Sequence, residues 1–304
     1  MSDQSLSQRS PDARNESIWA RASGRGPHWL RDHRLIARWV LVGSCVLFTL
    51  SALFPLIFMI QAAFRTERSW ANSQFALPTN PTLDSLRRLW AGGVVLGYLW
   101  HSAVITVGTV SLSVVLAVLA GYSFAKINWR MRRPVYLFVL AWIALPPVIL
   151  IVPIYIQMVD LHLIDSFWSL ILLYSAFNLP FNTYLMTSFF QSLPDELIEA
   201  SKVDGCGTNQ TFLRVMVPLA KPALGTLVIF NALYAWNEFV FALLLLTNDS
   251  VKPLTVGVQQ LQGRYTTDKP TIMMGLLIAS IPIIAVYVFF QKYLTRGIVL
   301  GAVK

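Results

Sequence analysis

The sequence predicts an all-α integral membrane protein with six transmembrane helices, because of its composition, its long apolar windows and its uneven distribution of basic residues. Of the 304 residues, 55% are hydrophobic and 13% are charged, and the mean hydropathy is +0.57. Soluble domains carry about 25% charged residues, so a water-soluble fold of this length would lack the polar surface to cover it.

Six apolar windows are long enough to cross a bilayer as helices. A hydrocarbon core of about 30 Å needs roughly 20 residues per helix. Backbone groups in lipid must be satisfied within each segment, which favours helices over barrel strands. The windows are 39–63, 99–125, 134–158, 166–190, 223–246 and 272–294.

The distribution of lysine and arginine predicts how these spans are oriented. The tail and the connections on one side hold 17 of these residues, and the connections on the other side hold 7. Basic residues favour the cytoplasmic side, so both termini are expected inside, as six spans require. This bias also accounts for the formal net charge of +9 without a nucleic-acid partner.

The predicted organisation follows from the windows and their orientation. We expect a basic cytoplasmic tail without stable structure (1–38), a first span (39–63), an outer loop (64–98), a core with five spans (99–294) and a cytoplasmic tail (295–304). The outer loop contains Trp70, Pro78, Pro81 and Trp90, which indicate a structured cap with aromatic interface anchors. A second outer connection, 247–271, is also long enough to meet a partner from outside.

Several classes of site have no support in the sequence. Cys45 and Cys206 are too few for a disulfide framework and lack metal-ligand spacing, so we expect small packing residues. The polar first 38 residues do not have the form of a cleavable signal peptide. No G-x-x-x-x-G-K-[ST] phosphate loop, H-E-x-x-H metal site or nucleophile constellation is present. We therefore expect no catalytic residue, no metal and no cofactor bound by this chain.

The inner connection 191–222 has a pattern that a simple turn does not need. Ser192, Pro194 and Asp195 are typical of a capped helix start. Gly205 and Gly207 then end this helix, and Thr208 can cap a second one. Phe212, Val215 and Met216 fall on one face of the second helix, and Pro218 and Pro222 end it.

Two short amphipathic helices of this kind need a partner for their apolar faces. One interpretation is a helix pair that lies on the membrane surface, which would expect a polar face rich in lysine and arginine. The segment has four acids and three bases, so its composition favours a groove on another protein.

The same segment resembles the EAA loop of binding-protein-dependent ABC importer permeases. That pattern is E-A-A, three residues, G, nine residues, then I-x-L-P. The chain has Glu199-Ala200-Ser201, then Asp204-Gly205, then Val215-Met216-Val217-Pro218 at the same spacing. Further likeness in 145–172, 235–249 and 291–304 is to the carbohydrate-uptake branch, and above all to the second permease subunit of maltose-type importers.

The resemblance implies a type I ABC importer permease with a MetI-like helical bundle. Two permease chains would form the pathway in a bacterial inner membrane, a dimer of cytoplasmic ATPases would bind ATP and Mg, and an extracytoplasmic binding protein would deliver a sugar. Residues 191–222 would then couple this chain to the ATPase. The resemblance assigns the contacts to Glu199, Ala200, Ser201, Asp204, Gly205, Val215, Val217 and Pro218.

Polar residues inside the fourth and fifth spans are candidates for a sugar path. They are Tyr174, Asn178, Asn182, Asn231, Tyr234 and Glu238, and Pro180 interrupts the first stripe. Amides, carboxylates and aromatic rings suit sugars, but the same groups also serve as hydrogen-bonding links between helices. The prolines 146, 147 and 153 are expected to kink the third span, and the stripe Ser102, Thr106, Thr109, Ser113 is expected to pack.

Other functions fit less well. A secondary transporter that works alone needs intramembrane ion couplers and often inverted repeats. The spans contain one acid, Glu238, and no visible repeat. An importer for sn-glycerol-3-phosphate or another non-sugar solute stays open as a substrate alternative, and a membrane enzyme lacks any paired acid and base.

Overall fold

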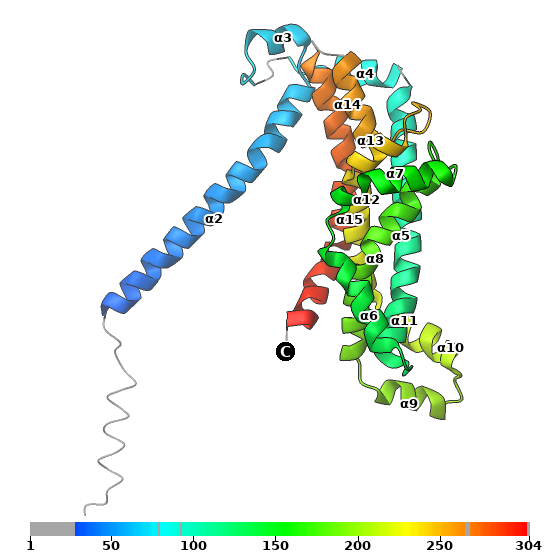
Figure 1. Cartoon of the computed structure of the whole chain (residues 1–304). Coiled ribbons are helices and arrows are strands. Elements are labelled where there is room, and N and C mark those ends of the chain that lie inside the picture. Colours follow the sequence, from blue (N-terminus) through cyan, green and yellow to red (C-terminus); the bar gives the residue numbers. More distant parts are fainter. Residues whose placement is uncertain (1–27, 78–79, 92, 265–267, 303–304) are drawn as a thin grey trace, which may run out of the picture. The chain divides into compact units, whose positions relative to one another are not determined.

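The structure is a computed structural model that describes residues 28–77, 80–91, 93–264 and 268–302. Every secondary-structure element in these ranges is a helix, which confirms the all-α class. The chain forms two compact units, residues 1–58 and 59–304, and each is treated by itself (Figure 1).

The first unit contains most of helix α2 (His28–Ala63). This helix begins at His28 and therefore includes residues 28–38 of the predicted tail. Arginine, leucine and alanine favour helix, and they extend the apolar span into its polar flank. Residues 1–27 lie outside the described part of the chain. Trp39, Phe48 and Phe54 are exposed, as a helix surrounded by lipid would have them.

Two short helices occupy the predicted outer loop of the second unit, α3 (Glu67–Asn72) and α4 (Asp84–Ala91). Thr66 caps α3 by accepting a hydrogen bond from the Ser69 N–H at 3.2 Å, and Trp70 is buried. Trp90 is exposed. The loop is therefore folded, and Arg88 joins it to Asp268 by an ion pair of 3.0 Å.

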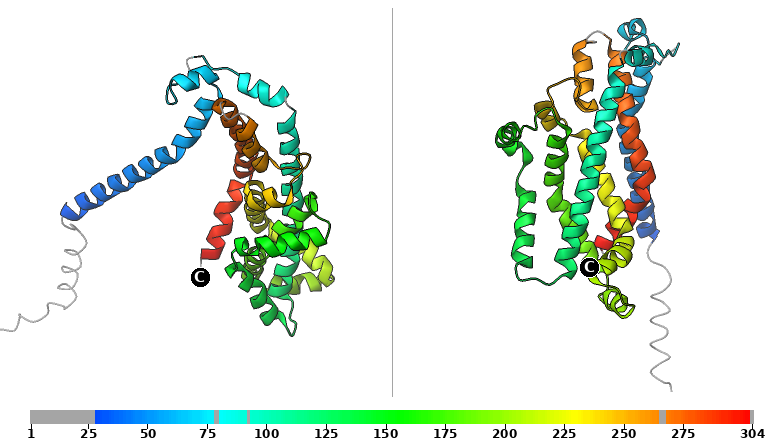
Figure 2. Two further views of the ribbon diagram at one scale, coloured as in Figure 1. Left: turned by 45° about the horizontal axis from the view of Figure 1, so that its top comes forward. Right: turned by 90° about the vertical axis from the view of Figure 1, so that its right-hand side faces the viewer.

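Four longer helices form the centre of the second unit (Figure 2). They are α5 (Val94–Lys126), α8 (Phe167–Ser192), α12 (Lys221–Asn237) and α15 (Lys269–Ala302). Helix α5 packs along α8, α12 packs against both α5 and α15, and α14 (Leu254–Arg264) packs on α15 and α5. Pro180 lies inside α8 without interrupting it, contrary to expectation, and α15 continues through most of the predicted tail 295–304.

The third predicted span, 134–158, is not one helix. It consists of α6 (Arg132–Ala141), two 3-10 turns (Trp142–Ala144 and Pro147–Leu150) and α7 (Ile151–Asp160), and its two halves meet at 92°. The break lies at Pro146 and Pro147, which lack the N–H groups that would continue α6. The kink predicted from the prolines is present, and it is a right-angled break.

The fifth predicted span, 223–246, is also broken. Helix α12 ends at Asn237, Glu238 is extended with φ −65° and ψ 131°, and a separate helix α13 (Val240–Leu245) follows. No proline or glycine occurs between Leu227 and Leu246, so the sequence contains no local signal for this break.

The number of membrane crossings follows from these helices. Three helices of the described residues are long and apolar enough to cross a membrane, and two bent pairs bring the number to as many as five. The first bent pair is the third predicted span, and the second joins residues 208–219 to α12 at 71°. Helix α8, with 26 residues, occupies the fourth predicted window but is not among these helices. The number of six spans therefore stays a prediction.

Candidate functional site

The inner connection folds as two short helical segments that leave the end of α8 (Figure 1). The first segment is α9 (Glu196–Val203). The second consists of α10 (Thr208–Thr211), a π-helical turn (Phe212–Met216) and α11 (Val217–Leu219). Thr208 is the first residue of α10 and not its cap, because Gly207 holds that position and donates its N–H to Gln210 Oε1 at 3.2 Å.

Gly205 makes the turn between the two segments. Its φ of +81° lies in the left-handed region, which glycine enters without steric cost. The Gly205 N–H donates to Lys202 O at 3.0 Å, and the Cys206 N–H donates to Ser201 O at 2.9 Å. These two bonds form a Schellman motif, which satisfies the last carbonyl groups of α9 and reverses the chain.

Ser201 holds the two segments together from inside. Its hydroxyl group donates to Ile198 O at 2.7 Å, and the hydroxyl oxygen lies 2.8 Å from Thr211 Oγ1. Both residues are buried. The serine therefore occupies a structural position on the inner side of α9, and the outer side carries the residues available to a partner.

The outer side of this helix pair combines acidic and apolar groups. Glu199, Ala200 and Asp204 are exposed, and Val203 is 88% exposed. Leu213 of the second segment is 62% exposed. Val203 and Leu213 were not among the predicted site residues, although they belong to the predicted segment. A water-exposed surface of this composition can accept a complementary groove.

The start of the first segment differs from the prediction. Ser192 is the last residue of α8, and its hydroxyl donates back to Phe189 O at 2.7 Å, so it does not cap α9. Lys126, at the end of α5, fixes the link instead. Its ammonium donates to Leu193 O at 2.7 Å and pairs with Asp195, and its side chain is 6% exposed. The sequence showed Lys126 only as one basic residue of a loop.

The second segment packs its apolar side into the bundle. Met216 is buried in a cluster with Tyr122, Phe190 and Ala220, and Phe212 and Val217 pack against this cluster. Val215 is half-buried and Pro218 is exposed. The predicted apolar face therefore points inward.

Two of the six predicted path residues join α8 to α12. Asn182 and Asn231 exchange side-chain hydrogen bonds of 2.9 and 3.2 Å, and both are buried. Asn231 also donates to Leu227 O at 2.7 Å. A reciprocal amide pair of this kind satisfies both side chains, which is the role of a hydrogen-bonding link between helices.

Three further predicted path residues lie together where α12 ends: Tyr174, Tyr234 and Glu238. The Tyr174 hydroxyl donates to Glu238 Oε2 at 2.5 Å, and its ring meets that of Tyr234 edge-on at 5.7 Å. The Glu238 carboxylate also accepts the Phe241 and Ala242 N–H groups at 3.0 and 3.2 Å. Glu238 therefore caps α13. Contrary to the prediction, it does not share a helical face with Asn231 and Tyr234, because α12 ends at Asn237.

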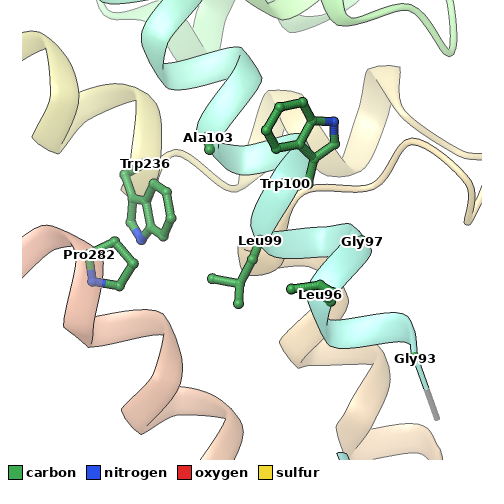
Figure 3. A pocket seen from close by; sticks show the side chains of 8 residues that line it. All are labelled: Gly93, Leu96, Gly97, Leu99, Trp100, Ala103, Trp236 and Pro282. Atoms are coloured by element: carbon green, nitrogen blue, oxygen red, sulfur yellow. The ribbon is translucent and has the colours of Figure 1, made fainter. Parts of the chain in front are cut away.

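The remaining path residue is Asn178, which lies one helical turn after Tyr174 in α8. The Asn178 side chain donates to Tyr174 O on its own helix at 2.8 Å. An apolar hollow of about 710 Å³ lies beside the start of α5, and its lining includes Trp100, Trp236 and Pro282 (Figure 3). None of the six predicted residues lines this hollow.

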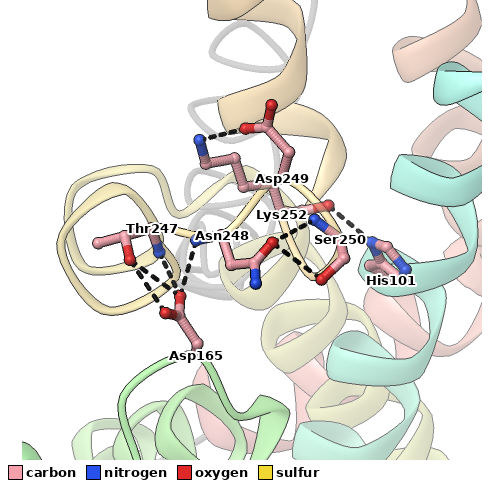
Figure 4. Close-up of polar contacts among 7 residues, drawn as sticks. All are labelled: His101, Asp165, Thr247, Asn248, Asp249, Ser250 and Lys252. Carbon is pink, nitrogen blue, oxygen red and sulfur yellow. Dashed lines mark hydrogen bonds and ion pairs between the residues drawn. The ribbon is translucent and has the colours of Figure 1, made fainter.

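Asp165 joins the α7–α8 turn to the connection after α13 (Figure 4). Its carboxylate accepts the N–H groups of Thr247 and Asn248 at 2.6 and 2.8 Å and the Thr247 hydroxyl at 3.0 Å. The bond from the Asn248 backbone lowers the pKa of the Asp165 carboxyl below its ordinary value. This contact was not predicted, because nothing local pairs residues 82 positions apart.

Metal ligands do not gather among the residues that the structure describes, where no three His, Cys, Asp or Glu side chains lie close enough to hold an ion. Cys45 and Cys206 are both free thiols.

The chain is similar to known proteins over most of its length. Residues 113–300 match the family described as binding-protein-dependent transport system inner membrane component. The multiple sugar-binding transport system permease protein MsmG of Streptococcus mutans is 34% identical over 257 residues, which cover 83% of this chain and 92% of the relative. The sulfoquinovosyl glycerol transport system permease protein SmoH of Agrobacterium fabrum is 30% identical over 255 residues, 84% of this chain and 90% of the relative.

A solved structure has the same fold. It is the crystal structure of a bacterial ABC transporter involved in the import of the acidic polysaccharide alginate. The matched chain is 25% identical, with a TM-score of 0.75, and the match covers 89% of this chain and 99% of that chain.

Proposed function

Since the chain belongs to the family of binding-protein-dependent transport system inner membrane components, we propose that it forms half of the translocation pathway of an ATP-driven importer for a sugar or sugar-like solute. The printed functions of similar permeases, among them multiple sugars and sulfoquinovosyl glycerol, support this substrate class. The observation that carries the proposal is the exposed helix pair at Gly205, which is built to meet a partner.

In this proposal the helix pair couples the chain to an ATPase. Glu199 and Asp204 offer charges to the ATPase cleft, and Ala200 and Val203 fill its apolar floor. Gly205, Ser201, Val215, Val217 and Pro218 shape the pair from behind. ATP and Mg bind to the ATPase dimer, so this chain has no enzymatic step of its own.

The other partners act on the membrane and on the outer side. A second permease completes the pathway, and a solute-binding protein delivers the sugar to the folded outer segments that include α3, α4 and α14. Both termini are cytoplasmic in this arrangement.

The six candidate path residues have two different roles. Asn182 and Asn231 satisfy one another, which favours a structural link between α8 and α12. Tyr174, Tyr234 and Glu238 form the group that we propose for solute contact, and Asn178 extends it by one turn. None of the six is a cation, so a phosphorylated substrate such as sn-glycerol-3-phosphate is disfavoured.

The test of the coupling role uses two neighbouring glycines. Gly205→Ala forces an alanine into φ +81°, whereas Gly207 has φ −73°, which alanine adopts freely. No atom lies within 4 Å of an added Cβ at either position. A tagged chain is purified from its own membranes in mild detergent, and copurified ATPase and ATP-dependent uptake are measured.

We expect Gly205→Ala to reduce the recovered ATPase and the uptake about tenfold and Gly207→Ala to change either less than twofold. An alanine in the left-handed region costs about 1–2 kcal/mol, and about 1.4 kcal/mol corresponds to a tenfold change in an equilibrium constant. Full recovery of the ATPase with Gly205→Ala would reject the coupling role. Uptake that persists after deletion of the ATPase would instead support a secondary transporter that works alone.

A further inference from the structure

A polar hollow beside the coupling segment gathers basic residues that the proposed function does not use. It has a volume of about 710 Å³ and lies between the connection 127–131 and helix α9. Its basic lining residues are Lys126, Arg130, Arg132, Arg133 and Lys202, and its acidic ones are Asp195 and Glu199. The cytoplasmic end of α5 and the start of α6 meet at the same end of the bundle (Figure 1).

Most of this positive charge lacks a counter-ion. Lys126 is neutralised by Asp195. Within the described part of the chain, no salt bridge or hydrogen bond engages the side chains of Arg130, Arg132 and Arg133, and Glu199 is exposed. The hollow therefore has an excess of cations, and guanidinium groups are suited to bind phosphate oxygens in a forked geometry.

A buried donor without an acceptor lies in the same lining. The Trp129 indole N–H is inaccessible to solvent and meets no hydrogen-bond acceptor among the described residues. Its ring packs on Phe124 at 5.7 Å, which fixes its position. Because this N–H has no accessible surface, a ligand in the hollow does not reach it, and the indole serves as an apolar wall beside the arginines.

The position of the hollow along the chain identifies the source of a phosphate ligand. The second predicted span ends at residue 125 and the third begins at residue 134, so the hollow lies at the depth of the lipid headgroups. Tryptophan concentrates at this depth, and basic hollows between helices there bind anionic headgroups. The topology of the chain alone would require basic residues on this side of the membrane, but it would not require that they line a common hollow.

We propose that this hollow binds the phosphate headgroup of an anionic membrane lipid. Arg130, Arg132 and Arg133 hold the phosphate oxygens. The site is a property of this chain in its membrane and does not depend on the coupling role or on the transported solute.

The test measures lipid retention rather than transport. The full chain, with the partners that copurify, is placed in mixed micelles that contain phosphatidylglycerol or phosphatidylcholine, and bound lipid is counted by native mass spectrometry. The double variant Arg130→Gln/Arg133→Gln is compared with Arg68→Gln/Arg87→Gln, which removes two exposed arginines of the outer segment.

We expect wild type to retain phosphatidylglycerol in preference to phosphatidylcholine. Each arginine near an anionic headgroup contributes about fivefold in affinity, so the hollow variant should lose about 25-fold and the outer variant less than twofold. Equal retention by the hollow variant and the outer variant would overturn the site.

Two further results would assign the hollow to another ligand. If an excess of inorganic phosphate displaces the lipid and raises the melting temperature as much as the lipid does, the ligand is a free anion. If a cross-linker placed at residue 130 or 133 captures an acidic segment of the ATPase and lipid is not retained, the surface belongs to that protein.

Discussion

Glu238 shows how one carboxylate determines where a helix ends. It accepts the Phe241 and Ala242 N–H groups and the Tyr174 hydroxyl, so a group that would be costly in an apolar bundle is fully satisfied. We predict that Tyr174→Phe lowers the free energy of unfolding by about 1.5–3 kcal/mol, because a hydrogen bond to a charged group is lost.

Tyr234→Phe is the matched control for this prediction. Its ring belongs to the same cluster, but the structure shows no hydrogen bond for the Tyr234 hydroxyl within the described residues. We expect a change below about 0.5 kcal/mol. Thermal unfolding of both variants in detergent is the measurement, and equal effects would show that Tyr174 contributes by packing alone.

Asp165 makes stability depend on pH. Its pKa is lowered in the folded state, so its contribution is present above the unfolded value of about 3.9 and is lost as the pH falls through the lower folded value. We predict that Asp165→Asn lowers the melting temperature at pH 7 and that the difference from wild type shrinks below about pH 4.

Asp84→Asn is the control for this acid titration. Asp84 is half-exposed and makes only a long contact of 3.9 Å with Arg87. Its replacement should leave the melting temperature nearly unchanged across the same range. A difference for Asp165→Asn that does not vary with pH would mean that the carboxylate charge is not involved.

Helices α5 and α8 lie in close contact at Gly121. A Cβ there would lie 2.4 Å from Met186 Cβ and 2.9 Å from its backbone carbon, so the helices would have to separate. At Gly108 the clash is 2.7 Å with the flexible end of Ile171. We predict that Gly121→Ala destabilises by about 2–3 kcal/mol and Gly108→Ala by about 1 kcal/mol.

Gly43 provides the reference for the glycine series. It lies in α2 with nothing within 4 Å of an added Cβ, so alanine there should be neutral or stabilise by about 0.5–1 kcal/mol. Unfolding of the three variants under one condition gives the order. A Gly121→Ala protein as stable as Gly43→Ala would show that the α5–α8 spacing is adjustable.

The elements that the sequence predicts are those with local signals. Long apolar windows locate α2, α5, α8 and α15, and the glycine spacing locates the turn at Gly205. Consecutive prolines predict the kink of the third span, but not its right angle. The break at Glu238 was not predictable, because it is stabilised by Tyr174 of another helix and not by a residue that disfavours helix. The roles of Lys126 and Asp165 depend in the same way on contacts between distant segments.

The orientation of the whole chain in the membrane is the prediction that connects all these parts. If both termini are cytoplasmic, the helix pair around Gly205 faces an ATPase inside, and the segment 64–98 faces a binding protein outside. Leu77 and Val203 are the probes, because they are 76% and 88% exposed and lie in opposite compartments under the prediction. Single cysteines at these positions are introduced into a background with Cys45→Ala and Cys206→Ala.

A membrane-impermeant maleimide then reports which compartment each cysteine faces. We expect Leu77→Cys to react in cells whose outer membrane is permeabilised and whose inner membrane is intact. Val203→Cys should react only after the inner membrane is permeabilised as well. The 17 to 7 distribution of basic residues is the physical cause, since translocating them is opposed by the membrane potential. The reverse labelling would place the coupling segment outside, where no ATP-driven partner could reach it, and would refute both the orientation and the coupling role.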